Sequence, residues 1–281
     1  MRAMVSYTTY ARILLLLPVI LFTNPTSGQG KGKGNELNYQ PVVGQSGKDV
    51  VWVPTPDILV EKMLDMAMIT PDDKLYDLGS GDGRTVITAA KRGTRSIGLE
   101  YNPDLVELSK ISAKREGVSK MAEFKVADIF DYDFTDATVV TMFLLSDINL
   151  RLRPKLLEMK PGTRIVSNTF TMAEWMADDS VYIDNDMVSW NRALMWIVPA
   201  KVEGKWILQN GGEILFLQRF QKVTGELRIT GQDPIAIEGK LRGVEITFTA
   251  GMTTYTGNVD GESISGSATS GSHSAKWSAS R

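Results

Sequence analysis

The chain has 281 residues, 43% of them apolar and 23% charged, which is the balance of an ordinary folded protein. Its formal net charge of -2 supplies no global field for nucleic acid, and the basic run Arg151, Arg153 and Lys155 is interpreted as a solvated helix face. There is no cysteine and only one histidine, His273, which excludes disulfides, thiolate catalysis, cysteine-ligated zinc and a histidine triad. We therefore expect no metal site.

The first 28 residues have the pattern of a targeting segment. Arg2 and Arg12 precede an apolar run at 13–22, and small residues follow at 26–28. The run is shorter than the ~20 residues of a comfortable membrane span. Residues 1–28 are therefore predicted to be a signal peptide or an uncleaved anchor, which places the protein in the cell envelope or at the inner membrane. Residues 29–49 are rich in Gly, Lys and Asn and are predicted to form a mobile linker.

From residue 50 to residue 222 strand and helix patterns alternate. Strands are predicted at 74–78, 96–100, 123–127, 138–145, 163–169, 193–198 and 213–220, and helices at 83–92, 103–116 and 148–159. Strands that alternate with helices of this length predict a parallel α/β sheet covered on both faces. The last two strand candidates would form a hairpin-like end to that sheet.

Two helix starts have the same composition. Thr55-Pro56-Asp57 and Asn102-Pro103-Asp104 each offer a capping side chain, a proline at the first helical position and an acid in the first turn. We expect Thr55 and Asn102 to cap these helices.

The last part of the chain, residues 223–281, has a different composition. It is dominated by Gly, Ser and Thr, with short alternating stretches such as 244–248 between regularly placed glycines. This pattern predicts a small module of antiparallel strands. Because so short a module without disulfides is marginally stable alone, we expect it to pack on the main domain or on a partner.

A glycine-rich loop joins the first strand to the next helix. Gly79, Ser80, Gly81 and Gly83 follow directly behind an acid, Asp77. Glycines let the backbone turn sharply and approach a ligand closely. A dinucleotide-binding loop needs a small residue after its last glycine, where this chain has an arginine. An acid in this place suits a cationic amino-acid moiety better than a pyrophosphate.

Acids also follow the next two predicted strands. Glu100 ends the second strand, where a carboxylate can accept hydrogen bonds from both ribose hydroxyls. Asp128 follows the third strand, where it can accept from the exocyclic amine of adenine while Ile129 contacts the ring. Three acids at three successive strand ends predict a single nucleoside site at one edge of the sheet.

These motifs resemble those of class I S-adenosylmethionine-dependent methyltransferases. The stretches 51–56, 76–84, 100–103 and 144–156 further resemble the lysine methyltransferases of the ATP synthase c-subunit and the adenine nucleotide translocator, and their bacterial relatives. The resemblance covers residues 50–220. It implies a Rossmann-like sheet of seven strands with the last inserted antiparallel, S-adenosyl-L-methionine as cofactor and a protein-lysine acceptor. The glycine-rich tail and the signal-like start depart from the mitochondrial members, so the acceptor's identity is not inherited.

Site roles follow from the same resemblance. Asp77 and the three glycines would hold the methionine part, Glu100 the ribose and Asp128 the adenine. Tyr101 and Ile129 complete the expected cofactor site. Thr55 would lie near the methyl donor, a role that competes with helix capping.

The acceptor side is less defined by sequence. Methyl transfer from a sulfonium needs orientation and desolvation more than a general base. Residues 142–147 lack the Asn/Asp-Pro-Pro-aromatic signature of enzymes that methylate amide or base nitrogens, which argues against DNA and glutamine side chains as substrates. For Asp147 two interpretations stay open. It either steers an incoming ammonium or is an ordinary acidic residue of a turn. Trp52, Tyr101 and Trp175 either wall the acceptor channel or serve in packing.

Two other interpretations stay open. The first is an NAD(P)-linked oxidoreductase with a Rossmann sheet. The second is a non-catalytic cell-envelope binding protein that keeps the methyltransferase fold and uses residues 224–281 as its binding surface. The sequence does not name the acceptor protein or the oligomeric state. We expect a protein partner with an accessible lysine and an association with a membrane. We expect no nucleic-acid partner.

Overall fold

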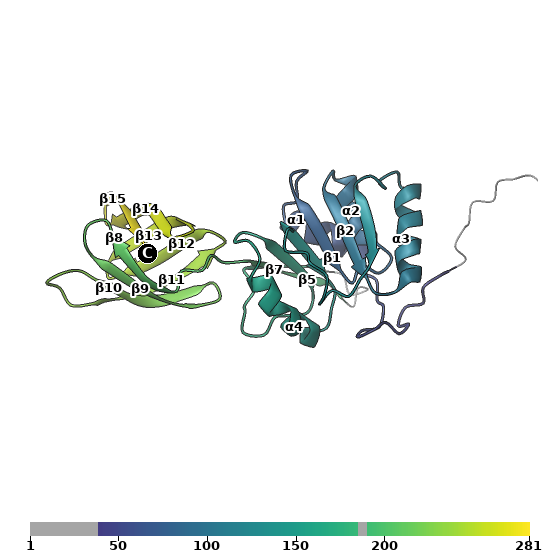
Figure 1. The fold of residues 1–281 in the computed structure, drawn as a ribbon, viewed down its shortest axis with the longest axis horizontal. Helices are drawn as coiled ribbons and strands as arrows, with labels where there is room; N and C mark the ends of the chain where they lie inside the picture. Colours follow the sequence, from purple (N-terminus) through teal and green to yellow (C-terminus); the bar gives the residue numbers. More distant parts are fainter. Residues whose placement is uncertain (1–38, 185–189) are drawn as a thin grey trace, which may run out of the picture. The chain divides into compact units, whose positions relative to one another are not determined.

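The structure is a computed structural model that describes residues 39–184 and 190–281 (Figure 1). The predicted signal peptide or anchor at 1–28, and the first part of the predicted linker, lie outside the described residues. Within the described part of the chain no helix is both long and apolar enough to cross a membrane.

A seven-stranded sheet forms the first domain, in the order β3-β2-β1-β4-β5-β7-β6 (Figure 1). Its strands are β1 (Lys74–Leu78), β2 (Arg95–Glu100), β3 (Ala122–Val126), β4 (Val139–Met142), β5 (Arg164–Asn168), β6 (Asp179–Tyr182) and β7 (Arg192–Ile197). The first five run parallel, and β7 is antiparallel to both β5 and β6. The strand order reverses between β1 and β4, the place where open α/β sheets bind their ligands.

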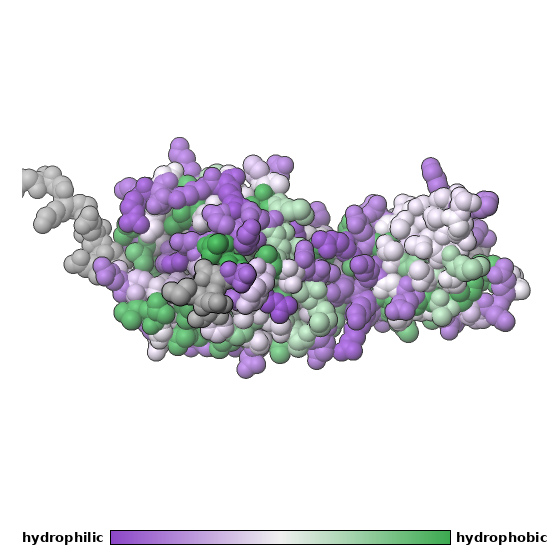
Figure 2. All heavy atoms as spheres, turned by 180° about the vertical axis from the view of Figure 1, so that it is seen from behind, coloured by the Kyte–Doolittle hydropathy of each residue, from purple (hydrophilic) through white to green (hydrophobic). Residues whose placement is uncertain are grey.

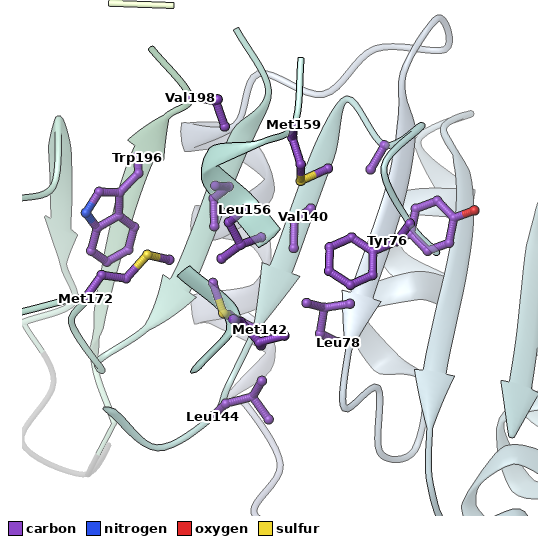
Figure 3. Close-up of a cluster of buried hydrophobic side chains, with 14 of the residues drawn as sticks. Tyr76, Leu78, Val140, Met142, Leu144, Leu156, Met159, Met172, Trp196 and Val198 are labelled. Atoms are coloured by element: carbon purple, nitrogen blue, oxygen red, sulfur yellow. The ribbon is translucent and has the colours of Figure 1, made fainter. Parts of the chain in front are cut away.

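Four helices cover this sheet. They are α1 (Asp57–Met66), α2 (Arg84–Lys91), α3 (Pro103–Arg115) and α4 (Ser146–Leu157). The apolar residues of α1 pack with Leu75 and Val139, and those of α2 and α3 pack with Phe124. The apolar residues of α4 pack on the opposite face of the sheet, with Tyr76 and Val140 (Figure 3). Tyr76 follows Leu75 on β1 and Val140 follows Val139 on β4, so neighbouring residues of each strand face opposite sides. The predicted sheet with two covered faces is confirmed.

The two expected helix caps differ in outcome. Asn102 caps α3, because its side chain accepts a hydrogen bond from the Asp104 amide at 2.9 Å. The Thr55 cap is wrong: the N-cap of α1 is Pro56, with no side-chain hydrogen bond. The Thr55 hydroxyl instead accepts from the Asn168 amide group at 3.3 Å, so a partner distant in sequence replaces the local cap.

The last strands form a separate closed barrel, in the order β10-β11-β12-β13-β14-β15-β8-β9. Its strands are β8 (Gly204–Leu208), β9 (Glu213–Arg219), β10 (Lys222–Arg228), β11 (Ile235–Arg242), β12 (Glu245–Ala250), β13 (Thr253–Asp260), β14 (Ser263–Ser270) and β15 (His273–Ser280). The antiparallel module was therefore predicted correctly in kind, but its extent was not. The segment 213–220 is a barrel strand and not the end of the sheet, and the expected boundary at 222/223 falls inside the barrel.

The physical reason for this difference is closure of the barrel. β9 pairs with β10, and β8 pairs with β15, a strand more than sixty residues further along the chain. These pairings leave no free edge in the barrel. Its interior holds its own core around Trp206, Phe216, Phe248 and Trp277. The outer surface of the barrel is pale over much of the view in Figure 2, in keeping with its many Ser, Thr and Gly residues.

Candidate active site

The loop from Gly79 to Gly83 has a backbone that only glycine adopts easily. The φ angles of Gly79, Gly81 and Gly83 are 75°, 53° and 80°. The amides of Gly79 and Ser80 donate to the Leu99 carbonyl at 2.8 and 3.0 Å, which fixes the loop against the end of β2. The loop thus presents bare backbone at the switch point of the sheet.

Close packing on both sides also requires these glycines. A Cβ at Gly83 would lie 2.7 Å from the Ser109 hydroxyl and from the Phe124 ring. A Cβ at Gly81 would lie 2.6 Å from Nε1 of Trp52. The indole of Trp52 therefore lies against the glycine loop, while α3 and β3 support the loop from the other side.

The carboxylate of Asp77 is buried within β1 at the start of this loop. Its Oδ1 accepts a hydrogen bond from the Thr141 hydroxyl on β4 at 2.7 Å. Burial raises the pKa of Asp77 to about 7, with a further increase from Glu100 and Asp82 and an opposing contribution from Thr141. A cation bound beside Asp77 would restore its charge, because an opposite charge favours the ionised form.

The other two predicted acids lie at the ends of β2 and β3. Glu100 accepts from the Gly81 amide at 2.9 Å and from the Asn102 amide at 3.0 Å, so it joins the glycine loop to the start of α3. Asp128 accepts from the Phe130 amide at 2.9 Å and forms an ion pair with Lys48. The hydrogen bond from Lys48 lowers the pKa of the Asp128 carboxyl.

Most of the predicted site residues line one pocket, which has a volume of about 980 Å³ with its open mouth included. The predicted residues that line it are Thr55, Asp77, Gly79, Ser80, Gly81, Glu100, Tyr101, Asp128 and Ile129. Gly83 is not among the lining residues and acts as the left-handed N-cap of α2. Asp147 is also not in the lining and is exposed in the first turn of α4. The three acids therefore meet at one edge of the sheet, as the strand pattern predicts.

Sequence analysis missed a turn that covers part of this pocket. The Gly44 amide donates to the Trp52 carbonyl at 2.9 Å, and the Trp52 amide donates to the Gln45 carbonyl at 2.9 Å. This turn, residues 42–52, carries Lys48 and Trp52 into the pocket lining. The mobile linker expected over 29–49 is therefore wrong for the described residues of this turn. Its glycines indicated flexibility, whereas backbone pairing organises them.

A second missed feature is Arg84, which ties the glycine loop to the start of α1. Its guanidinium donates to Asp82 at 2.7 Å, to the Thr55 carbonyl at 2.9 Å and to Asp57 at 3.2 Å. In the sequence this arginine indicates only that the loop does not fit a dinucleotide site. The structure gives it a role in fixing the segment that leads from Trp52 to Thr55.

The aromatic candidates for the acceptor side are placed differently from one another. Trp52 lines the pocket, and Tyr101 lines it with 54% of its surface exposed. Trp175 is fully buried, so its proposed place in a channel wall is wrong. Its peptide carbonyl accepts a hydrogen bond from the Trp196 indole at 2.7 Å, which fixes it in the core.

Three other aromatic residues lie at the same edge of the sheet. Phe143 follows β4 and lines the pocket, Phe170 follows β5, and Trp190 precedes the antiparallel β7. Their ring centroids are 5.5 to 6.0 Å apart. Sequence analysis did not single them out, although the rule that located the acids at strand ends also applies to Phe143 and Phe170.

Comparisons with known proteins agree with this geometry. Residues 77–179 match the model of the ANTKMT methyltransferase domain. A protein-lysine N-methyltransferase from Saccharolobus islandicus is 40% identical over 48% of this chain and 86% of its own length. The human lysine N-methyltransferase of the ATP synthase c-subunit is 39% identical over 37% of this chain and 45% of its own length, so the chain spans about half of that relative.

A solved structure adds a ligand to this picture. An RNA methyltransferase from Salinibacter ruber, in complex with S-adenosyl-L-homocysteine, is 42% identical over 53% of this chain and 96% of its own length. The TM-score of this match is 0.50. The match covers the domain that carries the pocket and not the whole chain.

Proposed function

The chain belongs to the protein-lysine methyltransferase family of S-adenosylmethionine-dependent enzymes, and from this we propose that it methylates lysine side chains of a protein substrate. The observation that carries the proposal is the 40% identity to an archaeal protein-lysine N-methyltransferase over 86% of that protein. S-adenosyl-L-methionine is the cofactor, which supplies a methyl group activated by a sulfonium.

The pocket supports this cofactor by its chemistry. Asp77 offers a buried carboxylate that a cationic amino group would keep ionised. Glu100 lies within hydrogen-bond distance of backbone amides and is half-buried, which suits a bidentate contact to ribose hydroxyls. We assign the adenine end to Asp128 and Ile129.

The residues of the chain then have three tasks in the reaction. They orient the two reactants, they exclude water, and they let the lysine lose its proton before attack. Attack by the neutral amine forms the N–C bond while the electron pair of the S–C bond returns to sulfur, so the positive charge passes to the methylated amine. Trp52 and the turn 42–52 lie over the pocket and reduce its contact with water.

RNA is the second candidate acceptor, because the similar protein from Salinibacter ruber is named as an RNA methyltransferase. The formal net charge of -2 and the sequence pI of about 5.6 offer no general attraction to phosphates. The overall charge of the chain therefore does not favour RNA as the acceptor.

The two remaining alternatives are weaker. An oxidoreductase would need a small residue where Arg84 follows Gly83, and Arg84 is engaged in fixing the loop. A non-catalytic binding protein has no need for a complete cofactor pocket, and this pocket keeps its glycines and all three acids.

The acceptor class can be tested with a labelled methyl donor. The purified full chain is incubated with S-adenosylmethionine labelled in its methyl group, together with membrane protein, soluble protein or total RNA in separate reactions. Label that is recovered as Nε-methylated lysine after acid hydrolysis supports the proposal. Label that is recovered only in nucleosides, or in lipid, overturns it.

We further propose that the enzyme acts at a membrane, on a membrane-associated acceptor. The proposal rests on the apolar run at 13–22 and on relatives named for the ATP synthase c-subunit and the adenine nucleotide translocase. Residues 1–28 would hold the enzyme at the inner membrane or export it to the envelope. N-terminal sequencing of the protein from fractionated cells tests this. A protein found with an intact terminus in the soluble fraction would refute it.

A further inference from the structure

The edge of the sheet that carries the pocket has two chemically different halves. The strands on one side of the switch point, β1, β2 and β3, lead to Asp77, Glu100 and Asp128. Those on the other side, β4, β5 and β7, carry the aromatic trio, which is Phe143, Phe170 and Trp190. Since β7 is antiparallel, its first residues lie at the same edge as the last residues of β5, where Asn168 is opposite Ala193. The cofactor assignment occupies the acidic half and leaves the aromatic half without a role.

The aromatic trio forms one surface. Phe143 and Phe170 are stacked with ring centroids 6.0 Å apart, and Trp190 lies 5.7 Å from Phe143 and 5.5 Å from Phe170. All three side chains are half-buried, and none belongs to the buried clusters that form the cores of the sheet or the barrel. Phe143 also lines the cofactor pocket, so the aromatic trio and the pocket are continuous.

The backbone beneath the trio is held in an unusual conformation. Thr169, directly before Phe170, has a φ of 61°, a region that a β-branched residue rarely adopts. Its amide donates to the Arg192 carbonyl at 2.8 Å, and its hydroxyl donates to the Asn168 side chain at 2.9 Å. Strained residues of this kind persist where surrounding contacts determine them, and they cluster at functional sites.

A buried asparagine fixes the next residue. Asn149 of α4 donates to the Phe170 carbonyl at 3.1 Å, and the Ser167 hydroxyl donates to the same carbonyl at 2.9 Å. Asn149 is fully buried and begins the Asn-Leu-Arg-Leu-Arg-Pro stretch that carries part of the family resemblance. Farther along that stretch, Arg153 donates to the Met172 carbonyl at 3.0 Å. The stretch thus fixes the segment that presents Phe170.

We propose that Phe143, Phe170 and Trp190 form the binding site for the acceptor amine, and that Asn149 is a positioning residue for it. The inference rests on the proposed lysine methylation and names the part of the site that takes the lysine. Aromatic faces attract a cationic ammonium, and their edges pack against the apolar stem of a lysine side chain.

A nucleobase is the other ligand that aromatic rings commonly bind. The trio is less suited to it, because its rings are in contact with one another and form a wall, with Trp190 at 64° to Phe143. A cation with an apolar stem needs only such a wall. Adenosine therefore serves as a comparison ligand in the test.

The first experiment measures recognition of a cation in the full chain saturated with S-adenosylhomocysteine, so that the acidic half is filled. The probes are choline, its neutral carbon analogue 3,3-dimethylbutan-1-ol, and adenosine, each titrated by NMR. We expect choline to bind at least about fivefold more tightly than the neutral analogue, within the range of a modest cation–π contact. Equal binding of the two, or tighter binding of adenosine than of choline, overturns the proposal.

The second experiment uses variants and a matched control. Phe143→Leu and Trp190→Leu are expected to remove the preference for choline and to raise the KM for the lysine acceptor about tenfold. Trp190 does not line the cofactor pocket, so in Trp190→Leu the affinity for S-adenosylhomocysteine should change less than twofold, which also shows that this variant folds. Trp190→Phe, which keeps an aromatic face, should restore most of the loss. Tyr182→Leu removes an aromatic side chain that is 64% exposed on β6 and should behave as wild type.

The two proposals fail in different ways. A wild-type protein that methylates no lysine refutes the proposed function. A wild-type protein that methylates lysine, with an acceptor KM unchanged in both leucine variants, refutes the acceptor site alone. For Asn149→Ala the expected result is a higher acceptor KM with cofactor affinity retained. A fall in kcat with an unchanged acceptor KM would contradict its positioning role.

Discussion

The Thr141 hydroxyl on β4 donates a hydrogen bond to the Asp77 carboxylate on β1 at 2.7 Å, across the point where the strand order reverses. Both side chains are buried, and this bond opposes the effect of burial, which raises the pKa of Asp77 to about 7. The charge of Asp77 is therefore sensitive to its partners near neutral pH. This sensitivity leads to the first two predictions.

The affinity for S-adenosylmethionine should rise with pH. Only ionised Asp77 attracts the cationic amino-acid moiety, and with a pKa of about 7 its ionised fraction grows about tenfold between about pH 6 and pH 8. Isothermal titration calorimetry across this range measures the effect. In Asp77→Asn the affinity should be weak and independent of pH. An affinity of the wild type that does not change with pH would contradict the assignment.

The stability of the cofactor-free protein should change in the opposite direction. Because the pKa of Asp77 is raised from 3.8 to about 7, the folded state holds this proton more tightly than the unfolded state between those values. The unfolding free energy contributed by this group therefore decreases as pH rises through this range. Thermal unfolding of wild type and Asp77→Asn should show a smaller decrease in the variant. An identical pH profile for both proteins would contradict the raised pKa.

Substitution of Gly81 by alanine should weaken cofactor binding by tenfold or more. The new Cβ would meet the Trp52 indole at 2.6 Å, at a residue with a φ of 53°. Gly117→Ala is the matched control, because Gly117 has a φ of 74° and open space around its Cβ position. Both variants should lose about 1 kcal/mol of stability from the backbone strain. If Gly117→Ala loses as much cofactor affinity as Gly81→Ala, the contact with Trp52 is not the cause.

Removal of Lys48 should tighten the binding of the cofactor by about two- to fivefold, within the worth of a partly exposed ion pair. Lys48 pairs with Asp128, the acid assigned to the adenine amine, so the two compete for one carboxylate. Calorimetry on Lys48→Ala measures this. Lys91→Ala, which removes a pair with Glu116 on the helices, should leave the affinity unchanged. Weaker binding in Lys48→Ala would show that Lys48 contacts the cofactor itself.

Damage to the barrel should leave the cofactor site intact. Trp206 is fully buried in the barrel's own core, and its replacement by alanine should cost about 3–5 kcal/mol of stability. We expect Trp206→Ala to lower the unfolding temperature of the barrel while the full chain still binds S-adenosylhomocysteine. Loss of cofactor binding at a temperature where the sheet remains folded would show that the barrel supports the site.

Much of the sheet could be predicted from local sequence patterns. The strand at 74–78, the glycine loop and the Asn102 cap depend on residues close together in the chain, and the structure has each of them. The short strand β6 was missed because its four residues are largely exposed and show no alternating apolar pattern.

The features that could not be predicted depend on partners distant in sequence. The barrel closes where β8 pairs with β15, and no local sequence pattern predicts this pairing. The same limit applies to Thr55, which binds Asn168 rather than capping α1. In the site, the acids were found because each ends a strand. Lys48 and Trp190 were not, because they approach from a turn and from an antiparallel strand.

The central claim is that the carboxylates at the edge of the sheet hold the cofactor, and Glu100 tests it most directly. Glu100→Gln removes the charge that strengthens contacts to ribose hydroxyls, and it keeps an acceptor oxygen for only one of the two amides, because Gly81 and Asn102 donate to different carboxylate oxygens. Calorimetry with S-adenosylhomocysteine should show binding weakened about tenfold or more in Glu100→Gln, corresponding to a charge-assisted hydrogen bond. Glu107→Ala on the exposed face of α3 should bind as wild type. Wild-type affinity in Glu100→Gln would contradict the account.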